Sequence, residues 1–365
     1  MKKQQLKHPI KLKSMRVKRT YTGGKLLDEM QSIFPSKDGN EPEEWVASTI
    51  ISRFDANPNA GLSIIEEGPH KGEFLRDLIV NNPSEMLGDR HVDKFGESLG
   101  FLAKLIDSYH RLNIQTHPDN DKAMEYFNSP FGKTEAWYII DTRPIEGQDP
   151  FLYLGFKTGI TKENWVKWIK NQDISSLENA LHKIPIQNGD VYLVESGMPH
   201  AIGTGTLLAE IQEPTDFTFR VEKMMDGKNS FPDEVYHQGI GYENMFECFH
   251  YDGYSLDELV AKTKVKPRIK DFSEGHELIE LLGTGQTTRF AMDKLIVRAS
   301  CVLTTVSSFR TAIVLSGKGV IHHEETVMEV SKSNELFLPL SDTSLFIEAL
   351  GEEPLEILIF YPPLS

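Results

Sequence analysis

The feature that most constrains the fold is a series of short apolar segments, separated by glycine and proline, in the second half of the chain. These segments lie at 191–194, 207–211, 217–221, 294–306, 310–321, 334–340, 344–350 and 355–361. Short apolar runs between turn residues are typical of the strands of β-sandwiches and β-barrels. We therefore predict a mainly β chain that builds two barrels.

Apolar residues recur at helical spacing in two parts of the first two-thirds of the chain. We interpret them as helical insertions in or near the first barrel. The predicted division is a first domain at 1–285, with helical insertions at about 55–110 and 161–183 and an irregular connecting segment at about 230–285, followed by a C-terminal β domain at 286–365.

Charge and composition exclude several classes of protein. The 365-residue chain has a formal net charge of −15 at pH 7, so a nucleic-acid backbone is not expected as its partner. No apolar run is long enough to span a membrane, and the basic stretch at 1–19 lacks the apolar segment of a secretory signal. The two cysteines, Cys248 and Cys301, are too few for a disulfide framework. We expect a cytoplasmic protein, a monomer or a small homo-oligomer, that binds a small molecule.

Two pairs of polar residues at strand spacing suggest a metal site. Gln115 and His117 form one pair, and Lys133 and Glu135 form the other. Residues i and i+2 of a strand point to the same face, so two neighbouring strands would bring these side chains together. The residues between the pairs are typical of a turn and a short helix.

A further candidate ligand, His200, lies in the stretch GDVYLVESGMPHAIGTG. Gly189, Gly197 and His200 fit the second signature motif of the cupin superfamily, G-x5-P-x-G-x-x-H, in which Glu195 replaces the usual proline. This resemblance implies barrels of the jelly-roll type and a metal-binding role for the histidine. A single histidine is more often structural, but two imidazoles, a carboxylate and an amide oxygen together suit a catalytic divalent ion.

Three longer stretches resemble the type I mannose-6-phosphate isomerase family, also called phosphomannose isomerase. They are LNIQTHPD at 112–119, GKTEAWY at 132–138 and GMPHAI at 197–202, and their order and separations agree with the family. The resemblance is strongest over 100–225. It implies two cupin-type jelly-roll barrels, of which the first is catalytic and holds one zinc ion per chain. The implied zinc ligands are Gln115, His117, Glu135 and His200.

The same resemblance implies the reaction and assigns one catalytic residue. The family interconverts mannose 6-phosphate and fructose 6-phosphate through a cis-enediol. Its acidic residue, aspartate and arginine match Glu210, Asp216 and Arg220, so Arg220 is the implied catalytic arginine. This chemistry needs a base near the migrating proton and positive charge at the developing oxyanion, and an arginine is always charged.

Four further residues are candidates because of their places in the predicted strands. Glu210 is the candidate general base, Lys133 shares a strand face with the glutamate ligand, and Lys104 is expected to reach the substrate phosphate. For these three, a solvated charge or a structural ion pair is the alternative. Asn113 replaces the serine that the family usually has at the phosphate end of the substrate, and it leaves the preferred sugar open.

Other functions fit parts of this pattern. A non-catalytic sugar-phosphate-binding cupin, an isomerase of another phosphorylated sugar and an iron-dependent cupin oxygenase are the alternatives. The presence of Arg220, Lys133 and Glu210 together favours the isomerase. The C-terminal barrel has His322 and His323 but no later G-x-x-H partner, so it is predicted to be metal-free, with both histidines on a surface strand.

Overall fold

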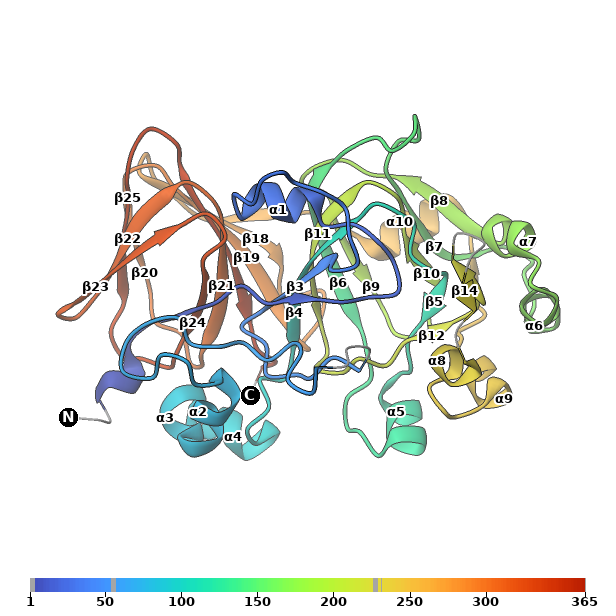
Figure 1. Ribbon diagram of the computed structural model, residues 1–365, viewed down its shortest axis with the longest axis horizontal. Coiled ribbons are helices and arrows are strands. Elements are labelled where there is room, and N and C mark those ends of the chain that lie inside the picture. Colours follow the sequence, from blue (N-terminus) through green and yellow to red (C-terminus); the bar gives the residue numbers. More distant parts are fainter. Residues whose placement is uncertain (1–3, 54–56, 226–228, 231, 365) are drawn as a thin grey trace.

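The computed structural model describes residues 4–53, 57–225, 229–230 and 232–364. Most of its strands form four sheets, which we number I to IV. Figure 1 shows them as two groups, one mainly green and cyan (sheets I and II) and one mainly orange and red (sheets III and IV). The chain is mainly β, as predicted, and each pair of sheets forms one of the two cupin-type barrels.

Sheets I and II form the first barrel. The order in sheet I is β12 (Phe219–Arg220), β5 (Gln115–Thr116), β10 (His200–Ile202), β7 (Phe151–Lys157) and β15 (Gly253–Tyr254), with β8 (Leu181–Pro185) also paired to β7. The order in sheet II is β16 (Lys264–Val265), β9 (Val191–Val194), β6 (Glu135–Thr142), β11 (Thr206–Gln212), β4 (Leu102–Ser108), β3 (Glu43–Val46) and β2 (Arg16–Val17). A separate hairpin joins β13 (Met224–Met225) to β14 (Asn229–Ser230).

Sheets III and IV form the second barrel. The order in sheet III is β1 (Ile10–Leu12), β24 (Glu335–Leu338), β21 (Arg310–Ser316), β26 (Leu355–Tyr361), β19 (Ala291–Val297), β18 (His276–Leu282) and β17 (Arg268–Phe272). The order in sheet IV is β20 (Ser300–Leu303), β25 (Leu345–Ala349), β22 (Lys318–His323) and β23 (Thr326–Ser331). The N-terminal strand β1 therefore belongs to the barrel built by the C-terminal residues, where Ile10 lies opposite Phe337.

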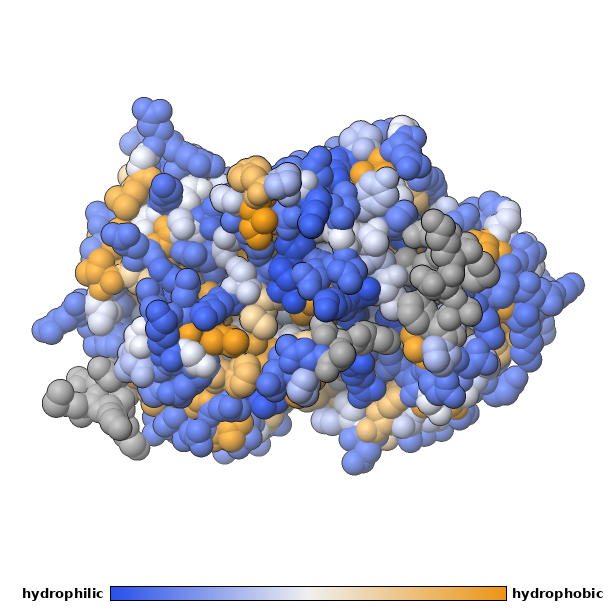
Figure 2. Space-filling view, viewed as in Figure 1, coloured by the Kyte–Doolittle hydropathy of each residue, from blue (hydrophilic) through white to orange (hydrophobic). Residues whose placement is uncertain are grey.

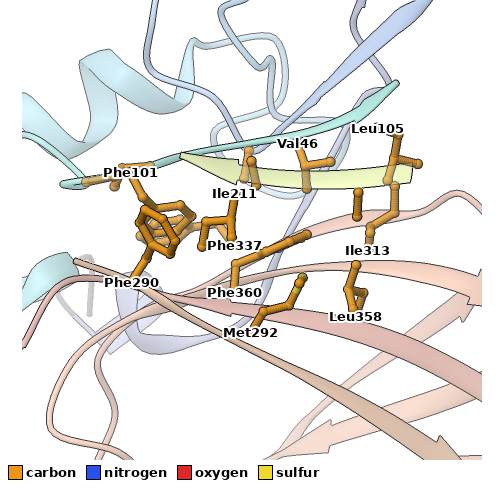
Figure 3. Packing of buried hydrophobic residues seen from close by; sticks show 14 of the residues in the cluster. Val46, Phe101, Leu105, Ile211, Phe290, Met292, Ile313, Phe337, Leu358 and Phe360 are labelled. Carbon is orange, nitrogen blue, oxygen red and sulfur yellow. The ribbon is translucent and has the colours of Figure 1, made fainter. Parts of the chain in front are cut away.

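The two barrels share an apolar interface between sheets II and III. Successive strand residues point to opposite faces, and in β11 Leu208 packs between sheets I and II whereas Leu207 packs between sheets II and III. Figure 3 shows this interface, in which side chains of sheet II face those of sheet III. The labelled residues include Val46, Leu105 and Ile211 on one side and Ile313, Phe337, Leu358 and Phe360 on the other.

The other face of sheet II carries polar residues and is not exposed to solvent, because it is turned towards sheet I. The face that alternates with the apolar interface carries Lys104 on β4 and Glu210 on β11, and both side chains are buried inside the first barrel. An alternating strand in an isolated antiparallel sheet would place such residues in water. In this chain Lys104 and Glu210 instead line the interior of the first barrel.

Helices lie around the barrels. They are α1 (Lys25–Met30), α2 (Leu75–Asn81), α3 (Pro83–Leu87), α4 (Asp89–Phe95), α5 (Asn120–Phe127), α6 (Lys162–Asn171), α7 (Ile174–Asn179), α8 (Asp233–His237), α9 (Tyr242–Phe246) and α10 (Leu256–Thr263), with a 3-10 turn η1 at Gln4–Lys7. The helix α6 buries Trp165 and Ile169 in an apolar cluster with residues of sheet I. This packing of a helix on a sheet is the role that its sequence pattern indicates.

The structure differs from the predicted division in three places. Residues 102–108, within the approximate bounds of the first predicted insertion, form the strand β4, in which the buried Lys104 and Asp107 interrupt the apolar residues without a strict alternation. The second insertion ends early, since β8 begins at Leu181. Residues 268–282, expected to be irregular, form β17 and β18 and pair with β19 in sheet III.

The prediction for the histidine pair of β22 is also wrong in part. His322 is half-buried, whereas His323 is buried, with an exposed fraction of 1%. The side chains of consecutive strand residues point to opposite faces, so the two histidines do not share one environment.

The molecular surface is largely polar on the face shown in Figure 2, where apolar residues form scattered groups. Among the described residues, no helix combines the length and the apolar character that a membrane crossing requires.

Candidate metal centre and active site

Three of the four predicted metal ligands meet inside the first barrel. His117 follows β5, Glu135 begins β6 and His200 begins β10. The Glu135 carboxylate lies between the two rings, with Oε2 3.1 Å from His117 Nε2 and Oε1 3.2 Å from His200 Nε2. All three side chains are buried. They form a His/Glu/His group with the spacing to hold a metal ion.

Backbone carbonyls orient both imidazole rings of this group. Nδ1 of His117 lies 2.7 Å from the carbonyl oxygen of Phe217, and Nδ1 of His200 lies 2.9 Å from that of Met198. Because a carbonyl only accepts hydrogen bonds, each Nδ1 carries the proton and each Nε2 keeps its lone pair. This is the arrangement of metal-ligating histidines, whose second ring nitrogen is fixed by a hydrogen bond.

Gln115, the fourth predicted ligand, lies beside this group. It pairs in register with His200, and its amide nitrogen is 3.2 Å from His200 Nε2. The amide therefore presents a donor to the histidine. Its oxygen can serve as a ligand only after the amide group rotates by half a turn, which exchanges two groups of nearly equal size.

Lys133 places a positive charge next to the donor atoms. Its Nζ lies 2.6 Å from Glu135 Oε2 and 3.0 Å from His117 Nε2. Burial alone would raise the pKa of Glu135, but Lys133 and the histidines hold this pKa well below its usual range. Burial and Lys133 lower the pKa of His117 to about 3. An ionised carboxylate and a neutral imidazole are the protonation states that a divalent cation needs in its ligands, so the group fits a metal.

A second pair of predicted residues, Lys104 and Glu210, lies on adjacent strands of sheet II. The two residues are opposite each other in the register of β4 and β11, and Lys104 Nζ is 3.2 Å from Glu210 Oε1. The other carboxylate oxygen accepts a hydrogen bond of 3.1 Å from the indole of Trp137. Burial opposes the charge of Lys104, yet Glu210 and Glu43 raise its pKa, so it remains an ammonium group.

Arg220 lies on β12, at the edge of sheet I, opposite Gln115. Its guanidinium donates to the carbonyl oxygens of Thr218 and Val235, both at 3.3 Å. Burial and the neighbouring Arg19 lower the pKa of Arg220 to about 10, so the group stays charged at neutral pH. Two guanidinium groups close enough to repel each other favour an anion between or beside them.

Asn113 presents an acceptor to its surroundings. Its amide nitrogen donates to the carbonyl oxygen of Glu222 at 2.7 Å. Its Oδ1 is buried and has no hydrogen-bond partner within the described part of the chain. An amide oxygen accepts hydrogen bonds, so Asn113 in this orientation suits a hydroxyl group better than a phosphate.

Sequence reasoning missed three residues that join this site, namely Arg19, Tyr21 and Glu43. Arg19 lies 3.0 Å from Glu43 and 3.2 Å from Asp216. The Tyr21 hydroxyl donates to Glu43 at 2.6 Å. Arg19 and Tyr21 lie in the segment RTYTGGKLLDE, which resembles the family, and Glu43 shares a strand with Trp45. The register that sets Trp45 opposite Lys104 is a tertiary feature.

The His/Glu/His group and the residues around Lys104 and Arg220 belong to one site, because the second group lines a cavity that adjoins the first. Among the predicted residues, its lining includes Lys104, Asn113, Gln115, Lys133, Glu210 and Arg220. Arg19, Tyr21 and Glu43 line it as well. The His/Glu/His group adjoins this cavity through Gln115 and Lys133, which contact His200 and Glu135.

Comparisons with known proteins agree with this geometry. A family model described as "Phosphomannose isomerase type I, catalytic domain" matches residues 28–138. A probable mannose-6-phosphate isomerase of Bacillus subtilis is 28% identical over 345 residues, which cover 94% of this chain and 98% of the relative. A mannose-6-phosphate isomerase of Streptococcus mutans is 33% identical over 213 residues, or 58% of this chain and 60% of the relative.

A solved structure extends the likeness to the whole chain. The crystal structure of the mannose 6-phosphate isomerase from Bacillus subtilis aligns with a TM-score of 0.71 and 25% identity, and the alignment covers 97% of this chain and 99% of that one. Both barrels therefore have counterparts there. The family model, the relatives and the solved structure confirm what three short motifs indicated, that this chain resembles the type I phosphomannose isomerases.

Proposed function

We propose that the chain is a zinc-dependent aldose–ketose isomerase that interconverts mannose 6-phosphate and fructose 6-phosphate through a cis-enediol. The observation that carries this proposal is the lining of one buried cavity by four cations, Arg19, Lys104, Lys133 and Arg220, beside the His/Glu/His group. The only carboxylates among its lining residues are Glu43 and Glu210. Four buried cations gathered at one cavity, in a chain of net charge −15, suit a small anionic substrate.

The metal centre of this proposal consists of His117, Glu135, His200 and, after rotation of its amide, Gln115. A mixed set of nitrogen and oxygen donors that leaves coordination positions open is typical of catalytic zinc. One ion per chain is expected. When bound, the ion would polarise oxygens of the sugar.

Glu210 is the proposed general base. Its carboxylate lines the cavity and is held in place by Lys104 on one oxygen and Trp137 on the other. In the proposed reaction it removes the proton from C2 of the aldose, which gives the cis-enediol, and delivers it to C1. The proton of the C2 hydroxyl passes to O1, so that C2 becomes the carbonyl carbon of the ketose. Lys104 remains an ammonium group beside it and donates hydrogen bonds to the sugar oxygens, where negative charge develops.

Arg220 and Lys133 are the proposed stabilisers of the enediolate. Both line the cavity and both are buried, so their charges act in a medium of low dielectric constant. Preorganised charges of this kind stabilise a developing oxyanion without reorganising during the reaction.

The phosphate end of the substrate is expected near the arginines. Arg19 and Arg220 offer forked donors that match phosphate oxygens, and Lys104 lies in the same cavity. The buried acceptor of Asn113 is then available to a sugar hydroxyl. Because this differs from the phosphate contact implied by the family's serine, an isomerase of another phosphorylated sugar is the alternative.

The proposal also includes the setting of the protein. We infer a phosphorylated hexose as its partner rather than nucleic acid or membrane, and a monomer or small homo-oligomer in the cytoplasm. The buried, unpaired thiols of Cys248 and Cys301 support a reducing compartment.

The test is an isomerase assay on mannose 6-phosphate, coupled to the consumption of fructose 6-phosphate. Chelated protein should be inactive, and added zinc should restore turnover. Arg220→Ala should abolish turnover. Arg298→Ala should retain it, because this change removes a half-exposed arginine of the C-terminal barrel. No turnover by folded, zinc-loaded protein would reject the substrate, and retained binding of the sugar phosphate would then favour the non-catalytic alternative.

The proton-transfer step has its own test. Reaction in deuterated water should place deuterium at C1 of fructose 6-phosphate or C2 of mannose 6-phosphate, since a base that holds the proton can exchange it with solvent. A hydrogen that migrates between C1 and C2 without any exchange over many turnovers would favour a hydride shift and argue against the cis-enediol. Glu210→Gln should remove the exchange together with the activity.

A further inference from the structure

A second group of two histidines and a glutamate lies on the C-terminal barrel. His8 lies between η1 and β1, His323 ends β22, and Glu324 follows in the turn to β23. One ligand atom from each of these residues lies within 4.8 Å of the others. Figure 1 shows the N-terminal end of the chain beside this barrel. The sequence gives no sign of the group, because 315 residues separate the two histidines.

The ring of His323 is held in an orientation suited to a metal ligand. Its Nε2 lies 2.9 Å from Ser341 Oγ, and its Nδ1 lies 2.7 Å from His8 Nδ1. With the proton on Nε2 and donated to the serine, Nδ1 keeps a lone pair directed at His8. A ligating histidine commonly has its second nitrogen fixed in this way.

His8 approaches this lone pair from the N-terminal segment. Its Nδ1 also lies 3.2 Å from Thr326 Oγ1, and that hydroxyl donates to the carbonyl oxygen of His323. One explanation is a simple hydrogen bond in which His8 Nδ1 carries a proton and donates it to His323. The Glu324 carboxylate accepts a hydrogen bond of 3.2 Å from Thr343, and it also lies within reach of both rings.

We propose that His8, His323 and Glu324 bind a divalent transition-metal ion that ties the N-terminal segment to the β22–β23 hairpin. Two imidazoles and a carboxylate suit zinc, copper or nickel rather than magnesium or calcium. Zinc–nitrogen bonds of about 2.0–2.1 Å in tetrahedral geometry need the two Nδ1 atoms slightly farther apart than 2.7 Å. His8 is half-buried and precedes the first strand, so a small shift of its ring costs little.

The proposed site is independent of the isomerase site. The three ligands do not line the cationic cavity, and they lie on a different barrel. An ion that binds the folded chain stabilises it by mass action. The expected role is therefore structural, with β1 held on sheet III next to β24 and the segment before it held on sheet IV.

The test is a count of tightly bound zinc in the full-length protein. After chelation and equilibrium dialysis against zinc, the wild type should bind two ions per chain, one in each group. His8→Gln should bind one and keep the isomerase activity of the wild type. His200→Asn should also bind one ion, but should lose the activity. His322→Gln is the matched control, since its ring contacts Glu348 instead, and it should bind two.

Two further variants test the ligand set. Ser341→Ala should weaken binding of the second ion by about 10-fold to 100-fold, as removal of a group that orients a ligand does elsewhere. Glu324→Gln, which removes a proposed ligand, should weaken it at least as much. A wild type that binds only one ion, or a His8→Gln variant that still binds two, would overturn the proposal and leave the histidine–histidine hydrogen bond as the explanation. Because activity is measured separately, failure of this proposal leaves the proposed isomerase function untouched.

Discussion

The two barrels have the same architecture and opposite interiors. Each consists of two facing sheets. The space between sheets III and IV is filled by an apolar cluster that includes Val314, Leu336 and Ile357. The space between sheets I and II holds buried charges such as Lys104 and Glu210 beside its own apolar cluster. The second barrel therefore has a solid apolar core, whereas the first encloses a polar cavity.

The difference shows how a charged interior is tolerated. Three buried cations of the first barrel each face a carboxylate, in the pairs Arg19–Glu43, Lys104–Glu210 and Lys133–Glu135. Such pairs recover the desolvation cost of their charges at best, and they add little net stability. Apolar burial, which includes the interface between the barrels shown in Figure 3, supplies the stability instead.

The largest expected effect comes from breaking one buried pair. Lys104→Met leaves the Glu210 carboxylate buried without its cation, so we expect a loss of about 3–5 kcal/mol of unfolding free energy, together with the loss of activity. Urea denaturation measures the loss of stability, and the coupled isomerase assay measures the loss of activity. Lys104→Met/Glu210→Leu should regain most of the stability and stay inactive. A double variant as unstable as the single one would contradict the assignment of stability to apolar burial.

The second prediction concerns the solid barrel. Leu336→Ala removes a buried side chain from the cluster between sheets III and IV, and it should cost about 2–5 kcal/mol of unfolding free energy. The turnover number of the folded variant, measured well below its melting temperature, should equal that of the wild type. A large fall in turnover under those conditions would show that the second barrel does more than stabilise the first.

The third prediction concerns the contact between the barrels. Burial and the neighbouring Glu44 raise the pKa of Glu335 well above its ordinary value of 4.5. The protonated acid therefore stabilises the folded chain fully below pH 4.5, and this contribution is lost as the pH rises through the raised value. As the pH rises above 4.5, urea midpoints should fall more steeply for the wild type than for Glu335→Gln, which imitates the protonated form. Parallel curves for the two proteins would contradict the raised pKa of Glu335.

The smallest expected effect concerns a helix outside the first barrel. The side chain of Thr161 caps the N-terminus of α6 by accepting a hydrogen bond from the backbone N–H of Asn164. Thr161→Ala should cost about 1 kcal/mol and leave both the metal content and the turnover unchanged. Thermal denaturation measures the cost. A change in turnover would mean that the layer of helices on sheet I influences the cavity.

The sequence by itself determined the strand-rich class of the fold, the resemblance to a family and the residues of the His/Glu/His group. Motifs such as KTEAW are local, so they can be recognised without knowledge of the fold. The expectation of two neighbouring strands with period-two pairs is wrong, because β5 and β6 lie in different sheets, and His117 and Lys133 lie outside them. Tertiary structure decided the rest. The stacking of sheets buries both faces of β4. The fold also brings Arg19 and Glu43 to the cavity, and it places His8 next to His323, 315 positions away in the sequence. These contacts depend on strand register and on the stacking of sheets, which no local pattern records.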